Sequence, residues 1–206
     1  MKEKIMYHGI PIDGRMPLFT VGNRQAIRDK LKTQTRRPID PQPVLVSDAW
    51  RWKNIAWGVS GAQISDEFIV DHCPYENVGD VRCMCEPLMR GPDGMVYCSD
   101  DRYMPHAISL ITGKRIPWRW KRDTLASIHM PTEAARTVCR VTDIRVERVQ
   151  EITGKDAENE IGGWDELHKY DPISEFSDLW ESIYAKRGLG WYVNPWVWVI
   201  EFRNVV

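Results

Sequence analysis

The sequence lacks any long hydrophobic run, and this excludes a protein anchored by a transmembrane helix. Its longest apolar stretches are only a few residues, as at Trp196 to Ile200, whereas a helix needs about 20 apolar residues to cross a membrane. The first nine residues also lack the apolar segment of a signal peptide. We therefore expect no contact with a membrane and a location in the cytoplasm.

The cysteine pattern gives no support to a disulfide framework or a zinc site. The five cysteines are Cys73, Cys83, Cys85, Cys98 and Cys139. An odd number in a chain without a secretion signal is typical of reduced thiols. The Cys-x-Cys spacing also differs from the Cys-x2–4-Cys pairs of most structural zinc sites. We expect no disulfide, no metal and no cofactor.

The sequence has almost no net charge, but its charges are unevenly distributed. The net charge of -1 combines two basic stretches and one acidic stretch. Residues 24–37 hold six lysines and arginines against Asp29, and residues 114–122 hold five around Trp118 and Trp120. Residues 156–181 hold nine carboxylates against Lys169, and we call this stretch the acidic belt. This pattern predicts a surface with distinct basic and acidic regions.

Internal repeats and low-complexity segments are also absent, which indicates one ordinary globular domain. The chain has 206 residues, of which 43% are hydrophobic and 28% are charged. This length is enough for one substantial core, and this composition is typical of folded proteins. We expect a single elaborated domain.

The N-terminal part predicts a short strand, a helix and a polar loop. Residues 17–20 suggest the strand, and the helix is expected over about Gly22 to Leu31, capped by Thr20 or Asn23. Residues 32–37 are expected to leave the helix as a loop, because a residue before proline disfavours helical angles.

The rest of the chain predicts mainly strands. Residues 41–131 alternate short apolar runs with turns, including a turn at residues 91–94. Longer strands are expected at 137–149, with a β-bulge near Thr142 and Asp143, and at 196–202. One helix is expected after Ser174, with an apolar face from Phe176 to Tyr184 and an end at Gly188.

Several motifs together resemble the ASCH domain of the PUA-like superfamily, in its phage and prophage branch. Residues 32–37, Lys-Thr-Gln-Thr-Arg-Arg after a short helix, resemble the Lys-x-x-Thr-x-Arg element of that family. Gly79-Asp80, opening a strand that ends at Glu86, resembles its second element, although Cys85 stands where phage relatives have arginine. Residues 127–131, 141–150 and 194–199 also look like the phage group.

The resemblance implies a fold and a ligand. The fold would be mainly β within the α+β class: a PUA-like β-barrel with flanking helices over residues 17–206. It would follow an N-terminal extension of residues 1–16 and carry insertions at about 39–78 and 87–136. The ligand would be RNA or a modified nucleoside or nucleotide, held in a basic cleft in the cytoplasm of a bacterial host. Lys32, Thr35, Arg36, Arg37 and Glu86 would line that cleft.

Some relatives hydrolyse acetylcytidine or cleave RNA, so the resemblance also implies an alternative as a hydrolase. Thr35 would then be the nucleophile, Lys32 the base and Glu86 the proton shuttle. A lysine has an ordinary pKa near 10.4. Burial and the charges of Arg36 and Arg37 would lower that pKa, whereas ionised Glu86 would raise it. A lysine that stays charged would serve as a clamp for a phosphate or a base carbonyl.

Structural roles are an alternative for each of these residues. Lys32, Arg36 and Arg37 could form a solvated basic loop, Thr35 could supply a turn hydroxyl, and Glu86 could pair with an arginine. Trp118 and Trp120 could stack on bases or belong to the core, and His129 could contact a ligand or serve the structure. A further alternative is a phage protein that binds a host protein through the acidic belt.

Overall fold

Strands outnumber helices in the described part of the chain, as the sequence predicts for a mainly β protein of the α+β class. The computed structural model describes residues 4–47, 49–53, 55–59, 72–75, 77–98, 106–163 and 171–205. The chain divides into two units. Unit 1 holds Met1–Asp29, Gly79–Val141 and Arg203–Val206, and unit 2 holds Lys30–Val78 and Thr142–Phe202. Within the described ranges, no helix has the length and apolar character required to span a bilayer.

The described part of unit 1 contains short strands, one α-helix and two 3-10 helices. Its elements are β1 (Met6–Tyr7), β2 (Ile10–Pro11), β3 (Gly14–Arg15), α1 (Val21–Arg28), β8 (Val81–Cys83), β9 (Leu88–Gly91), β10 (Gly94–Tyr97), β11 (Thr124–Leu125), and the 3-10 helices η1 (Ser127–His129) and η2 (Thr132–Ala134). The strands β9 and β10 form an antiparallel hairpin across the turn predicted at residues 91–94. Parallel pairing joins β3 to β8, and antiparallel pairing joins β8 to β12 (Val138–Arg148).

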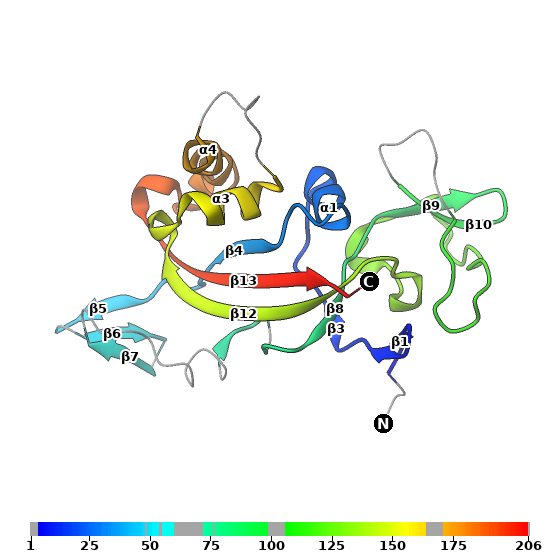
Figure 1. The fold of residues 1–206 in the computed structure, drawn as a ribbon, viewed down its shortest axis with the longest axis horizontal. Coiled ribbons are helices and arrows are strands. Elements are labelled where there is room, and N and C mark those ends of the chain that lie inside the picture. Colours follow the sequence, from blue (N-terminus) through cyan, green and yellow to red (C-terminus); the bar gives the residue numbers. More distant parts are fainter. Residues whose placement is uncertain are drawn as a thin grey trace. The chain divides into compact units, whose positions relative to one another are not determined.

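Unit 2 combines a sheet with two helices. Its elements are β4 (Gln34–Pro38), β5 (Val44–Val46), β6 (Ala49–Trp52), β7 (Ile55–Val59), η3 (Val149–Glu151), α3 (Gly154–Ile161), α4 (Pro172–Tyr184), η4 (Ala185–Arg187), η5 (Trp191–Val193) and β13 (Trp196–Asn204). The long strands β12 and β13 contribute residues to both units. In unit 2 the strand order is β12-β13-β4, with β4 antiparallel to β13. Figure 1 shows α3 and α4 on one face of β4 and β13.

Each unit has its own hydrophobic core. The core of unit 1 contains buried residues such as Leu88, Met95 and Met130. The core of unit 2 contains Phe176 and Trp180 from α4, packed with Val197 and Val199 from β13. Residues 196–202 are apolar at successive positions, and this pattern predicts an interior strand. The strand is confirmed as β13.

The first helix begins where the sequence predicts and ends earlier. The hydroxyl of Thr20 accepts a hydrogen bond from the Asn23 amide at 3.4 Å and caps α1. The helix ends at Arg28, because the chain turns away through Lys30 at a positive φ of 62°. Leu31, expected on the apolar face, is therefore 52% exposed. The strand expected at residues 17–20 is wrong, since these residues have no regular structure.

The helix α4 confirms the prediction made from its apolar residues. It begins at Pro172, capped by Asp171, whose carboxylate accepts hydrogen bonds from the next two free amides at 3.0 and 3.1 Å. Phe176, Trp180 and Tyr184 are buried, whereas Leu179 and Ile183, expected on the same apolar face, are exposed. The turn η4 follows and ends at Gly188, which has a positive φ of 70°.

The polar loop predicted at residues 32–37 is confirmed only for Lys32 and Thr33 and is wrong from Gln34 onward, where the residues form the strand β4. Its backbone pairs with β13, with Arg36 opposite Val199. Lys32, Gln34, Thr35 and Arg36 are all buried. The solvated basic loop is therefore wrong for Lys32 and Arg36, and residues 24–37 do not form an exposed basic surface. Ionised side chains can be buried here because carboxylates from neighbouring elements neutralise them.

The sheets formed by the described residues are open. Unit 1 contains the orders β3-β8-β12 and β10-β9-β11, and unit 2 contains β12-β13-β4 and β5-β6-β7. No closed barrel is found among these strands. The strand predicted at 137–149 is confirmed as β12. Its alternation of buried and exposed positions shifts by one residue between Val141 and Ile144, where the sequence also shows a shift in the apolar pattern.

Candidate functional site

A buried carboxylate in unit 1 holds two arginines. Glu86 is 3% exposed and lies just after β8. Arg136 donates two parallel hydrogen bonds to it, from Nε to Oε2 and from Nη2 to Oε1, both at 2.7 Å. Arg28, at the end of α1, donates a third bond to Oε1 at 2.7 Å. Two guanidinium groups on one carboxylate leave this cluster with one excess positive charge.

The surroundings of Arg136 restrict its position. Its guanidinium lies over the ring of Tyr97, 4.0 Å from the ring centre. The Tyr97 hydroxyl donates a hydrogen bond to the carbonyl of Ala134 at 2.5 Å, and burial raises the pKa of this hydroxyl. A guanidinium held by a bidentate carboxylate and an aromatic face has little freedom to rotate. Arg136 is thus preorganised.

A cavity of about 130 Å³ lies beside these two arginines. Its lining residues are Tyr7, Arg28, Arg136, Thr137, Val138 and Asn204, and all belong to unit 1. The Tyr7 hydroxyl lies 3.4 Å from the carbonyl of Arg136, and burial raises the pKa of Tyr7. The amide of Asn204 donates to the carbonyl of Ile27 at 2.9 Å. The lining therefore combines two cations with hydroxyl and amide groups.

The basic stretch at residues 114–122 lies on the surface of unit 1, and its cations are exposed. Trp118 and Trp120 form an edge-to-face pair, with ring centres 5.2 Å apart, and both pack against the core of unit 1. The indole of Trp118 donates to the carbonyl of Arg122 at 2.9 Å. The two tryptophans are half-buried, so they combine features of both predicted roles.

His129 lies in η1 and is exposed. This position allows contact with a ligand, and its role stays a prediction.

The lysine of the predicted cleft is buried in unit 2. Lys32 is 2% exposed, and its Nζ donates to the carbonyl of Glu160 and lies 3.4 Å from the Glu160 carboxylate. Burial lowers the pKa of Lys32 below its ordinary value, and Glu160 opposes this shift, while the charges of Arg37 and Arg36 add to it. Burial thus decides the direction of the Lys32 pKa shift, which the sequence leaves open.

Arg36 is the centre of an ionic network between β4, β12 and α3. Its side chain is completely buried and contacts three carboxylates: Glu147, Asp156 at 3.5 Å and Glu160 at 3.7 Å. Its own backbone amide donates to Glu160 at 2.9 Å. Arg145 joins the network through Glu147 at 3.2 Å and Asp156 at 3.4 Å. These contacts give Arg36 a structural role.

Thr35 and Arg37 lie on the opposite face of β4 from Arg36, because successive side chains of a strand alternate between faces. Thr35 is buried and Arg37 is half-buried. The structure therefore brings Lys32 and Arg36 together around Glu160, and it places Thr35 on another face. Glu86 belongs to unit 1, whereas Lys32 and Thr35 belong to unit 2.

The structure adds residues that the sequence motifs miss. Arg28, Arg136, Tyr7 and Asn204 line the cavity in unit 1. The alternative in which Glu86 pairs with an arginine describes the observed contacts, and Arg28 lies in the first basic stretch. A search for cations able to neutralise Glu86 could have suggested Arg28, but Tyr7 and Asn204 are distant in sequence and carry no motif.

Much of the acidic belt has contacts within unit 2. Asp156 and Glu160 join the Arg36 network, Asp171 caps α4, and Glu181 accepts a hydrogen bond from the Trp191 amide at 2.6 Å. Asp165 and Glu166 of the belt lie outside the described residues. Binding of a host protein through the belt stays a prediction.

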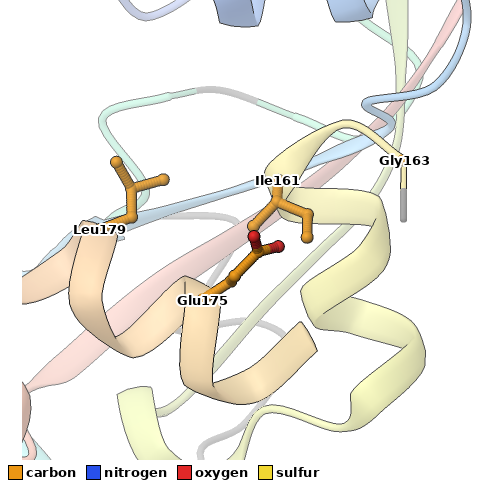
Figure 2. Close-up of a pocket in the computed structure, with 4 residues that line it drawn as sticks. All are labelled: Ile161, Gly163, Glu175 and Leu179. Carbon is orange, nitrogen blue, oxygen red and sulfur yellow. The ribbon is translucent and has the colours of Figure 1, made fainter. Parts of the chain in front are cut away.

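Unit 2 contains another cavity, of about 280 Å³. Figure 2 shows its lining, with Ile161 and Gly163 at the end of α3 and Glu175 and Leu179 on α4. The site residues predicted from sequence are not among these four. The lining residues that the structure describes include one carboxylate, from Glu175, and no cation.

No protein-family model matches the chain, and no curated protein matches it. Among solved structures, the chain is similar to the crystal structure of protein EF3133 from Enterococcus faecalis V583, of the family model DUF984. The TM-score is 0.42 at 10% sequence identity, and the similarity covers 96% of this chain and 80% of that chain. A likeness this weak assigns neither a fold nor a function.

Proposed function

We propose that the protein binds RNA or a modified nucleotide, and that unit 1 carries the binding surface. The observation that carries the proposal is the pair of arginines, Arg28 and Arg136, held on buried Glu86 at the edge of a cavity. Preorganised guanidinium groups bind phosphate groups well, because their planar N–H donors match the phosphate oxygens. Tyr7 in the same lining offers an aromatic ring beside the cations.

The exposed stretch at residues 114–122 supports the same function. Its five cations would neutralise phosphates of the backbone, a contribution that depends strongly on salt. The exposed parts of Trp118 and Trp120 would stack on bases, at about 1–3 kcal/mol for each base. Single-stranded RNA fits this combination best, because its bases are free to stack.

The finer assignment of the fold is part of the same proposal. We propose that the chain is an ASCH-domain protein of the PUA-like superfamily, in its phage branch. The order of its motifs, from residues 32–37 through Gly79-Asp80 to residues 194–199, supports this assignment.

Fluorescence anisotropy with a labelled single-stranded RNA tests the function. We expect binding to weaken as the salt concentration rises. Each phosphate contact should add about -0.7 to the slope of log K against the logarithm of the salt concentration. The triple variant Arg119→Glu, Lys121→Glu, Arg122→Glu should weaken binding at least tenfold. A variant with the same charge change in unit 2, Lys155→Glu, Lys186→Glu, Arg187→Glu, is the matched control and should bind nearly as the native protein does. No binding by native protein at low salt would contradict the proposal.

A hydrolase is the second candidate, and the lowered pKa of Lys32 favours it. A neutral lysine could act as a base, whereas Thr35, the predicted nucleophile, lies on the opposite face of β4 from Arg36. The test is incubation with acetylcytidine and with mixed RNA, followed by mass spectrometry. Loss of turnover in Lys32→Ala, Thr35→Ala and Glu86→Gln, with retained folding, would establish a hydrolase. Absence of turnover in the native protein would contradict the hydrolase and leave binding as the one proposed function.

A further inference from the structure

We propose that the cavity lined by Tyr7, Arg28, Arg136, Thr137 and Asn204 is a site for a phosphate monoester, the group found at a phosphorylated end of RNA or on a mononucleotide. This inference rests on the proposed function and names the chemical group that this site takes.

The first argument is charge. Glu86 accepts three hydrogen bonds from guanidinium groups, so its negative charge is matched within the cluster. Arg28, Arg136 and Glu86 together carry one net positive charge beside the cavity. This net charge would attract an anionic group, and it would give an uncharged group no such attraction. Glu86 orients the arginines, and the ligand would meet the guanidinium groups.

The second argument is the supply of donors. An arginine carries five N–H groups, and Arg28 uses one on Glu86 and one on the Gln25 side chain at 2.5 Å. Donors of Arg28 are thus left for a ligand. The lining adds the hydroxyl group of Thr137, whereas the Tyr7 hydroxyl donates its proton to the carbonyl of Arg136 at 3.4 Å. N–H and O–H donors of this kind suit the three terminal oxygens of a phosphate monoester.

The third argument is size. The cavity of about 130 Å³ is well below the roughly 300 Å³ at which sites begin to enclose a whole small molecule. It has room for a head group of a few atoms. A phosphate inside an RNA chain is esterified on both sides, so the nucleosides on both sides would have to enter the cavity with it. A terminal monoester needs only one connection, and its second negative charge strengthens the attraction to two arginines.

Competition binding with defined RNA ends tests the inference. The probes are one RNA sequence with a 5′-phosphate, with a 3′-phosphate or with hydroxyl groups at both ends, together with a mononucleotide and inorganic phosphate. We expect at least tenfold tighter binding of one phosphorylated form over the hydroxyl form. The preferred form shows whether the 5′ end or the 3′ end of the RNA supplies the phosphate.

Variants connect the preference to the cavity. Arg28→Gln should abolish the preference for the phosphorylated end, and Arg28→Lys should retain part of it, because lysine keeps the charge but lacks the fork of donors. Glu86 keeps both bonds from Arg136 in these variants, so the fold should persist, and circular dichroism checks this. Arg140→Gln is the matched control, since it removes a cation of unit 1 that does not line the cavity.

The outcomes separate this inference from the proposed function. Equal binding of all three RNA forms, still sensitive to residues 119–122, would overturn the phosphate site and leave RNA binding intact. Binding of the mononucleotide, lost in Arg28→Gln, without any binding of RNA would support the phosphate site and overturn RNA as the ligand. A preference that survives Arg28→Gln would overturn the assignment to this cavity.

Discussion

Glu86 and Arg136 meet through two parallel hydrogen bonds of 2.7 Å, Nε to Oε2 and Nη2 to Oε1. The pair is bidentate, and a carboxylate buried to this degree accepts a third bond from Arg28. Its geometry connects the end of α1, the chain after β8 and the chain before β12, which are distant in sequence. The contacts of this one carboxylate therefore organise the cavity in unit 1.

Glu86→Gln should destabilise the protein. The substitution removes the charge that compensates two guanidinium groups, each only about a quarter exposed or less. We expect the free energy of unfolding to fall by about 2 kcal/mol, measured by urea denaturation followed by tryptophan fluorescence. Asp93→Asn is the control in unit 1, because the Asp93–Arg115 pair is exposed and should contribute less than about 0.5 kcal/mol. Equal effects of the two substitutions would contradict the role of Glu86.

Arg36→Met should be more damaging than loss of a surface cation. Arg36 is completely buried among Glu147, Asp156 and Glu160, so its removal leaves carboxylates without their main partner. We expect a loss of about 3–5 kcal/mol in the free energy of unfolding. The exposed Lys155→Met should change it by less than about 0.5 kcal/mol. Thermal and urea denaturation measure both. A stability near native for Arg36→Met would mean that the network is dispensable.

Acid should weaken unit 2 through Asp156. Burial alone would raise the pKa of Asp156, but hydrogen bonds from Gln34 and Thr153, with the charges of Arg36 and Arg145, lower it below its ordinary value. The stabilisation is therefore complete above the unfolded pKa of about 3.9 and is lost as the pH falls through the folded pKa. We expect the difference in unfolding free energy between native protein and Asp156→Asn to shrink from pH 6 to pH 2. A difference independent of pH would exclude this linkage.

Alkali should act on Lys32 in the opposite sense. Burial lowers the pKa of Lys32, so the folded protein releases this proton before the unfolded chain does. Between the folded pKa and about 10.4 the unfolded chain binds more protons, and stability should rise with pH. The difference in unfolding free energy between native protein and Lys32→Met should thus increase up to about pH 10. Subtracting Lys32→Met cancels the opposing titration of tyrosines such as Tyr97. A flat difference would show that Lys32 titrates normally.

The elements that were predicted correctly depend on local patterns. The cap at Thr20, the turn at residues 91–94 and the helix containing Phe176 and Trp180 follow from neighbours in sequence. The strand β4 was missed because its burial depends on carboxylates of β12 and α3, which no local pattern indicates. A basic stretch looks the same in sequence whether solvent or carboxylates surround it.

The sequence by itself determined the mainly β composition, the long strands β12 and β13, the absence of a long apolar helix in the described residues, and the presence of clustered charges. Hydrophobic periodicity and capping act over a few residues, so they can be inferred without a structure. Only the tertiary structure decided which charges face each other. It placed Arg36 among carboxylates in unit 2 and placed Arg28 and Arg136 on Glu86 beside a cavity in unit 1, because ionic contacts depend on distances between atoms that the order of residues does not specify.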